Sequence, residues 1–185
     1  MSYDREALIE LIAQESLRRG QFTLASGKQA SYYLDCRKVT LHPKGANLIA
    51  AGMLEEIQSL GELPAAVGGM AIGADPITAS IVTLAGQQDL GLKGFMVRKE
   101  PKDHGTGQQV EGPVEPGQKV IIVEDVITSG GSALKAVEVA REFGLEVDQV
   151  IAIIDRLAGG EEAFAAKGVK LTTLTTIRDF GIEPE

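Results

Sequence analysis

The chain has 185 residues, of which 18 are Lys or Arg and 26 are Asp or Glu, so its net charge is −8. This length suits one domain, residues 1–185, with a core large enough to fold without disulfides. The acidic balance argues against binding to nucleic acid or to an anionic membrane surface. No apolar run reaches the roughly 18 residues of a membrane helix, the first ten residues are unlike a secretion signal, and a single cysteine excludes an intramolecular disulfide. We therefore expect a cytoplasmic globular protein.

The first sixty residues predict two helices separated by a polar, glycine-containing stretch. Apolar residues at helical spacing predict a helix over residues 3–19, ended by Gly20. Residues 21–40 predict short strands joined by a turn at Ser26–Gly27. A second helix is predicted from Pro43 to Gly61, because proline suits the start of a helix and glycine suits its end.

From residue 65 onward, apolar strands alternate with amphipathic helices. The predicted strands are residues 65–67, 94–97, 119–123, 149–154 and 169–174, and the predicted helices are residues 75–85, 132–143 and 161–167. Because the strands are apolar without interruption, this pattern predicts an α/β fold with a mostly parallel central sheet flanked by helices. The polar segment 100–117 is too long for a plain connection in a compact domain, which favours a functional loop.

Four of the predicted strands are followed by a pair of polar or glycine residues. The pairs are Gly68–Gly69, Arg98–Lys99, Glu124–Asp125 and Asp155–Arg156. Because parallel strands place their carboxyl ends at one edge of a sheet, these pairs are predicted to line one ligand-binding crevice. The alternative is that strand ends are polar only because the chain leaves the core there.

The segment VIIVEDVITSGGS, residues 120–132, is the most specific feature of the sequence. It predicts a buried strand, two acids, a loop of small residues and the start of a helix, where backbone N–H groups and hydroxyls can bind a phosphate. It is neither a Walker P-loop nor a GxGxxG fingerprint. Ionised carboxylates are acceptors only, so Glu124 and Asp125 are suited to sugar hydroxyls. The predicted ligand is a ribose 5-phosphate.

This segment resembles the thirteen-residue motif by which type I phosphoribosyltransferases bind 5-phospho-α-D-ribose 1-diphosphate (PRPP). The resemblance implies the fold of that family, a mostly parallel sheet flanked by helices with a small N-terminal hood. It also implies that PRPP is bound by the motif residues Glu124, Asp125, Val126, Ile127, Thr128, Ser129, Gly130, Gly131 and Ser132.

Three further segments are similar to orotate phosphoribosyltransferases. MVRKEPKDHGTGQQVEG, residues 96–112, resembles their mobile catalytic loop, here about 99–114. FTLASGKQASYYLD, residues 22–35, resembles their hood, here about 20–40, and GGMAIGADPI, residues 68–77, resembles the loop that meets the diphosphate. The chain departs from several members of the family at Ala25 and at Ile72–Gly73, where those members have lysines.

The resemblance implies transfer of a phosphoribosyl group from PRPP to orotate, a pentosyl transfer that gives orotidine 5′-monophosphate and diphosphate in pyrimidine (UMP) biosynthesis. The implied catalytic residues are Lys102, His104 and Asp125. Diphosphate binding is implied for Arg98, Lys99, Lys102 and His104, and orotate binding for Thr128, Arg156 and Lys28. Mg²⁺ is implied as a cofactor held mainly by substrate and water, as is a homodimer that shares the catalytic loop between subunits.

Several alternatives remain open from the sequence. The chain could be another type I phosphoribosyltransferase that acts on a purine or uracil, or a regulator that senses PRPP. The cations of residues 98–104 could form a solvated surface, and Arg156 could pair with Asp155. Cys36 is predicted to be a small packed residue rather than a nucleophile.

Overall fold

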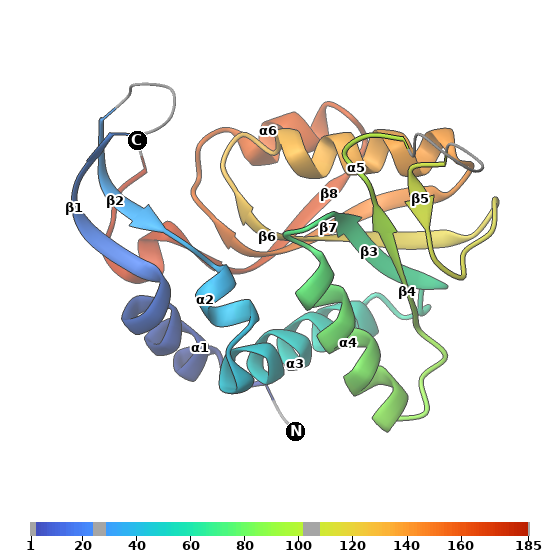
Figure 1. The fold of residues 1–185 in the computed structure, drawn as a ribbon, viewed down its shortest axis with the longest axis horizontal. Helices are drawn as coiled ribbons and strands as arrows, with labels where there is room; N and C mark the ends of the chain where they lie inside the picture. The colour runs from blue at the N-terminus through green and yellow to red at the C-terminus, as the bar shows by residue number, and fades with distance from the viewer. Residues whose placement is uncertain (1–2, 24–28, 102–107, 185) are drawn as a thin grey trace.

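The computed structural model describes residues 3–23, 29–101 and 108–184. Across these residues, six strands form one sheet in the order β5-β4-β3-β6-β7-β8 (Figure 1). The strands are β3 (Ala66–Met70), β4 (Lys93–Val97), β5 (Val110–Glu111), β6 (Lys119–Ile127), β7 (Glu146–Asp155) and β8 (Lys170–Thr176). The short edge strand β5 is antiparallel to β4, and the other neighbours are parallel.

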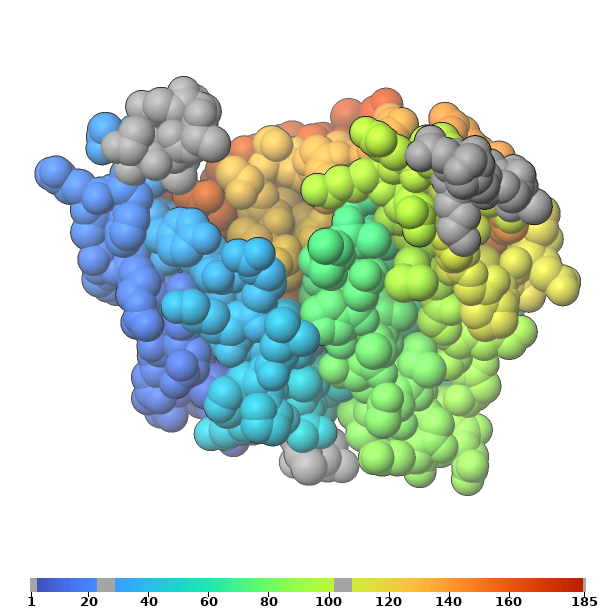
Figure 2. Space-filling view, in the orientation of Figure 1, coloured from blue at the N-terminus to red at the C-terminus, as the bar shows by residue number. Residues whose placement is uncertain are grey.

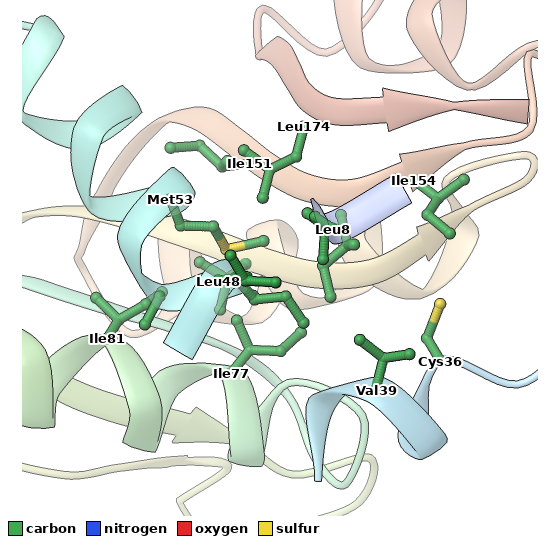
Figure 3. Close-up of a cluster of buried hydrophobic side chains, with 14 of the residues drawn as sticks. Leu8, Cys36, Val39, Leu48, Met53, Ile77, Ile81, Ile151, Ile154 and Leu174 are labelled. Atoms are coloured by element: carbon green, nitrogen blue, oxygen red, sulfur yellow. The ribbon is translucent and has the colours of Figure 1, made fainter. Parts of the chain in front are cut away.

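Helices cover both faces of the sheet (Figure 1). Helices α1 (Arg5–Leu11), α3 (Pro43–Ser59) and α4 (Asp75–Gln87) lie on one face, and α5 (Gly131–Glu142) and α6 (Gly160–Ala165) lie on the other. The sheet residues of the first face pack with Leu8, Leu48 and Met53 of these helices (Figure 3). The predicted α/β fold with a mostly parallel, helix-flanked sheet is therefore confirmed.

The N-terminal segment forms a separate hairpin, which stands beside the main sheet (Figure 1). Its strands β1 (Leu17–Thr23) and β2 (Gln29–Leu34) are antiparallel, with Leu17 opposite Leu34. A π-helical turn over Ile12–Ser16 joins α1 to β1, and the short helix α2 (Arg37–Thr40) follows β2. The prediction of one helix over residues 3–19 is wrong at its end. Pairing with β2 draws residues 17–19 into a strand, because tertiary contacts override weak local helical propensity.

Two strands, β3 and β6, extend three and four residues beyond their predicted ends. The predicted strand 65–67 continues as β3 through Gly68 and Gly69 to Met70. A side chain at Gly68 would collide with the carbonyl oxygen of Phe95, so glycine allows the close approach of β4. Likewise, β6 continues past Val123 to Ile127, so the acid pair lies within the strand rather than after it.

Two smaller predictions about local structure agree with the fold. Cys36 is a buried free cysteine, 2% exposed, and it packs in the same core cluster as Val39 and Ile154 (Figure 3). The helix predicted to begin at Pro43 does so. Of the helices in the described ranges, none combines the length and apolar character needed to cross a membrane.

Candidate active site

The carboxyl ends of four adjacent parallel strands, β4, β3, β6 and β7, meet at one edge of the sheet. The pairs singled out from the sequence lie in the last residues of these strands or directly after them: Gly68–Gly69 and Glu124–Asp125 are within β3 and β6, Asp155 ends β7, and Arg98 follows β4. The sheet therefore brings the four pairs to one edge. The β1–β2 hairpin, called the hood below, stands beside this edge (Figure 1). The surface is hollowed between the hood and the segment around β3 and α4 (Figure 2).

The phosphate-loop segment, residues 128–132, follows β6 and leads into α5. Gly130 is the residue before the helix and has a φ of 79°, in the left-handed region that favours glycine. A Cβ atom there would lie 2.9 Å from the ring of Phe164 in α6, so glycine also allows the loop to pack closely on that ring. The first backbone N–H groups of α5 therefore face a cavity of about 190 Å³ lined by Glu124 and residues 126–133. Such a helix start favours a bound anion.

The acid pair lies directly beneath this loop. Glu124 is 5% exposed and lines the same cavity. Its Oε1 accepts the backbone N–H of Asp125 at 3.1 Å, whereas its Oε2 is buried without a hydrogen-bond partner. Burial, together with the neighbouring charge of Asp125, raises the pKa of Glu124 to about 8. Asp125 is half-buried, and its Oδ1 accepts the N–H of Val126 at 2.7 Å.

The turn after β3, residues 71–74, lies over the acid pair. A Cβ atom on Gly73 would be 3.6 Å from Oε1 of Glu124 and 3.8 Å from Oδ1 of Asp125. The backbone N–H of Ala71 donates to the carbonyl of Val97 at 2.8 Å, which fixes the start of the turn against β4. Ile72 is 80% exposed. The turn therefore offers backbone groups and an open surface beside the carboxylates.

Arg156 follows β7 and is held by the hood. Its Nε donates to the hydroxyl of Tyr32 at 2.6 Å, and its guanidinium carbon lies 4.7 Å from the centre of the Tyr32 ring. The carboxylate of Asp155 instead accepts the backbone N–H of Leu157 at 2.8 Å. The alternative pairing of Arg156 with Asp155 is therefore wrong. The Asp155 carboxylate is hydrogen-bonded to the backbone of Leu157, and the Arg156 guanidinium is hydrogen-bonded to Tyr32.

Tyr32 was missed as a site residue by the sequence reasoning. It alternates with exposed neighbours along β2, so that Ala30 and Tyr32 face inward. This alternation is visible in the sequence only once the strand register is known.

The cationic segment after β4 begins with Arg98 and Lys99, which lie next to the edge strand β5. Arg98 forms an ion pair with Glu111 at 3.3 Å across the β4–β5 pair, and Lys99 is exposed. The side-chain amide of Gln109 donates to the carbonyls of Arg98 and Lys99 at 3.0 and 3.2 Å. The predicted residues Lys102, His104 and Lys28 lie outside the described residues, as does Ala25.

The described residues hold no group of three or more His, Cys, Asp or Glu side chains that could bind a metal ion. The donors that line the loop cavity are carboxylate, hydroxyl and backbone groups of Glu124, Thr128, Ser129 and Ser132. Oxygen donors of this kind suit a hard cation accompanied by a phosphate ligand.

Comparisons with known proteins identify the family of the chain. The family model for the phosphoribosyl transferase domain matches residues 40–181. The chain is 73% identical over 185 residues to an orotate phosphoribosyltransferase of Rhodopirellula baltica, covering 98% of this chain and 96% of that protein.

Solved structures are also similar. An orotate phosphoribosyltransferase of Mycobacterium tuberculosis in complex with Fe(III) dicitrate superimposes with a TM-score of 0.83 at 37% identity, covering 96% of this chain and 99% of that one. The same organism's enzyme in complex with PRPP superimposes with a TM-score of 0.79 at 34% identity, with coverages of 96% and 99%.

Proposed function

The chain belongs to the orotate phosphoribosyltransferases, within the phosphoribosyl transferase domain family, and from this premise we propose how its residues carry out the reaction. It is a transferase that moves the phosphoribosyl group of PRPP to orotate in pyrimidine biosynthesis. The bond between C1 of the ribose and diphosphate breaks, and its electron pair leaves with diphosphate. A ring nitrogen of orotate releases its hydrogen to solvent as a proton and forms the new bond to C1, which gives orotidine 5′-monophosphate.

The observation that carries the proposed PRPP site is one cavity shared by Glu124 and the helix start. Glu124 lines the same cavity of about 190 Å³ as residues 128–132. We assign the 5′-phosphate to the loop and the ribose hydroxyls to Glu124 and Asp125. Asp125 then also places negative charge beside the ribose ring, where positive charge develops as the C1–O bond lengthens.

Arg156 is assigned to the carboxylate of orotate. A guanidinium can bind a carboxylate through two parallel hydrogen bonds, which distinguishes orotate from uracil and from purines. The half-buried position of Arg156 beside the phosphate loop supports this assignment, since its backbone N–H donates to the carbonyl of Ile127 at 2.8 Å. Thr128 and Lys28 are proposed as further contacts to the base.

The cations of the loop are assigned to the departing diphosphate. Arg98, Lys99, Lys102 and His104 would bind it, with Lys102 and His104 acting on the leaving group. Mg²⁺ fits this site because the donors around the cavity are oxygens, and it neutralises charge on the diphosphate when bound. The ion would be held by the diphosphate, the ribose hydroxyls and water.

Turnover with different bases tests this function. Purified protein is mixed with PRPP, Mg²⁺ and either orotate, uracil or hypoxanthine, and loss of the base is followed by absorbance. We expect turnover of orotate alone, and loss of turnover when the metal is chelated. Turnover of uracil or hypoxanthine at a comparable rate would contradict the role of Arg156. Tight PRPP binding without turnover of any base would favour a regulator.

A homodimer with a shared loop is also proposed, on the resemblance of residues 96–112 to the family's catalytic loop. Lys102→Ala and Asp125→Asn are each expected to lose most activity, and mixing the two inactive proteins should restore part of it. Restoration is expected because a mixed dimer has one site with both an intact loop and an intact acid pair. No restoration after proven subunit exchange would contradict the sharing of the loop.

A cytoplasmic location is proposed as well. The single buried cysteine supports a reducing compartment.

A further inference from the structure

The guanidinium of Arg156 is fixed by a residue from the other end of the chain. Tyr32 lies 124 positions away, in β2 of the hood, and its hydroxyl accepts the Nε–H of Arg156 at 2.6 Å. The guanidinium carbon also lies 4.7 Å from the centre of the Tyr32 ring, within the range of a cation–π contact. Two different interactions with one tyrosine therefore restrain a side chain that is flexible in isolation.

The backbone of Arg156 is restrained as well. Its N–H donates to Ile127 at the end of β6, and the next N–H, that of Leu157, donates to Asp155. Both ends of the Arg156 side chain are thus held, the Cα end by the sheet and the guanidinium end by the hood. Within the described residues, the side chain of Arg156 makes one hydrogen bond, the one from Nε to Tyr32. Its two Nη nitrogens donate no hydrogen bond to a described residue.

A carboxylate can approach a guanidinium in two ways, side-on through Nε and one Nη, or end-on through both Nη nitrogens. The bond to Tyr32 occupies Nε and leaves the end-on edge available. We propose that Tyr32 is a positioning residue for orotate: its hydroxyl takes the Nε hydrogen of Arg156 and so presents the two Nη nitrogens to the orotate carboxylate. This inference rests on the proposed assignment of Arg156 to that carboxylate.

The ring and the hydroxyl of Tyr32 make separable contributions. Tyr32 is 4% exposed and belongs to the core cluster that includes Leu8 and Met53, so its ring has a structural role of its own. Phenylalanine keeps the ring and removes only the acceptor for Nε. The neighbouring Tyr33 is 44% exposed and packs against Phe22 with ring centres 5.9 Å apart. Tyr33→Phe is therefore a matched control, because it removes a hydroxyl from the same strand without touching Arg156.

The test is steady-state kinetics of the full chain with orotate and PRPP. Tyr32→Phe should raise KM for orotate about tenfold, the effect of one hydrogen bond to a charged group, and change kcat and KM for PRPP by less than about twofold. Tyr33→Phe should leave all three constants unchanged. An unchanged KM for orotate in Tyr32→Phe would overturn the inference, as would an equal rise in KM for both substrates, which indicates a structural effect.

Arg156→Gln separates this inference from the proposed function. If Arg156→Gln leaves KM for orotate unchanged, the carboxylate assignment itself is wrong. If Arg156→Gln raises that KM and Tyr32→Phe does not, only the role of Tyr32 is wrong. The double variant should have the KM of Arg156→Gln alone, because Tyr32 acts through the guanidinium. A further rise in the double variant would overturn the inference. Arg156→Lys, which keeps the charge without the Nε fork, should not restore wild-type KM.

Discussion

The phosphate-loop segment and the hood are built in opposite ways. The acid pair, the loop and the start of α5 are consecutive residues, and the bonds that shape the pair join immediate neighbours, Glu124 to Asp125 and Asp125 to Val126. The hood is placed by bonds between residues far apart, such as Arg19 to the carbonyl of Phe180, 161 positions away. The difference teaches that the proposed PRPP site is encoded locally, whereas the placement of the hood depends on a few distant contacts.

The largest expected effect comes from changing the buried carboxyl of Glu124, which lies in the locally built region. Its pKa is raised from 4.5 to about 8, so the folded protein retains a proton that the unfolded chain releases between these values. Stability should therefore fall as pH rises from about 4.5 to about 8. The Glu124→Gln side chain does not titrate. The free energy of unfolding of Glu124→Gln relative to wild type should therefore increase by about 1.4 kcal/mol for each pH unit between these two values.

The measurement is urea unfolding of Glu124→Gln and wild type at pH 5 and pH 8. Glu142→Gln, an exposed glutamate at the end of α5, is the control and should show the same difference from wild type at both pH values. A stability difference for Glu124→Gln that does not grow with pH would mean that the site does not hold a neutral carboxyl.

Asp125→Asn tests the other half of the acid pair. It removes a charged acceptor for a ribose hydroxyl, and kcat/KM for PRPP should fall about 10- to 100-fold, as expected for a hydrogen bond to a charged group. The melting temperature should change little. Asp148→Asn is the matched control, since Asp148 is 59% exposed and pairs with Lys119 at the opposite end of the sheet. A similar loss in both variants would show that charge alone, and not position, matters.

Gly130→Ala tests the geometry of the phosphate loop, and Gly159→Ala is its control. Gly130 and Gly159 each precede a helix with φ of 79° and 86°, but only Gly130 faces a ring, that of Phe164 at 2.9 Å. Both alanine variants should lose about 1 kcal/mol from backbone strain. Gly130→Ala should lose about 1 kcal/mol more through overpacking, and it should raise KM for PRPP. Equal unfolding energies and equal KM values in the two variants would contradict the close packing.

The smallest expected effect concerns the attachment of the hood. Arg19→Met removes the bond to the carbonyl of Phe180 and should cost about 1 kcal/mol of unfolding free energy. Because Arg19 lies opposite Tyr32 in the hairpin, KM for orotate should rise modestly while KM for PRPP stays constant. Arg18→Met is the control, since within the described chain the side chain of Arg18 makes one hydrogen bond, a long one of 3.4 Å to the carbonyl of Gln14. A larger effect on PRPP than on orotate would contradict the division between the two regions.

The same division explains what could be predicted from sequence. The sheet, its helices and residues 124–132 were recognisable because each is a local pattern: an apolar run, a helix start or a specific motif. The end of the first helix was not, because residues 17–19 take their conformation from β2. The contact between Tyr32 and Arg156 was also missed, because it joins residues 124 positions apart and depends on how the hairpin folds back. Gly68 and Gly69 were placed after the strand because their role, the close approach of β4 at Gly68 and of β6 at Gly69, is visible only in the sheet.

The two bonds from Gln109 to the carbonyls of Arg98 and Lys99 have a consequence for the edge of the sheet. The edge strand β5 has only two residues, Val110 and Glu111, so few strand-pair bonds hold it to β4. The side-chain amide of Gln109 adds two bonds just beyond β4, and the backbone N–H of Arg98 donates to the carbonyl of Gln109 at 2.8 Å. The positions of Arg98 and Lys99 are therefore set by the edge of the sheet.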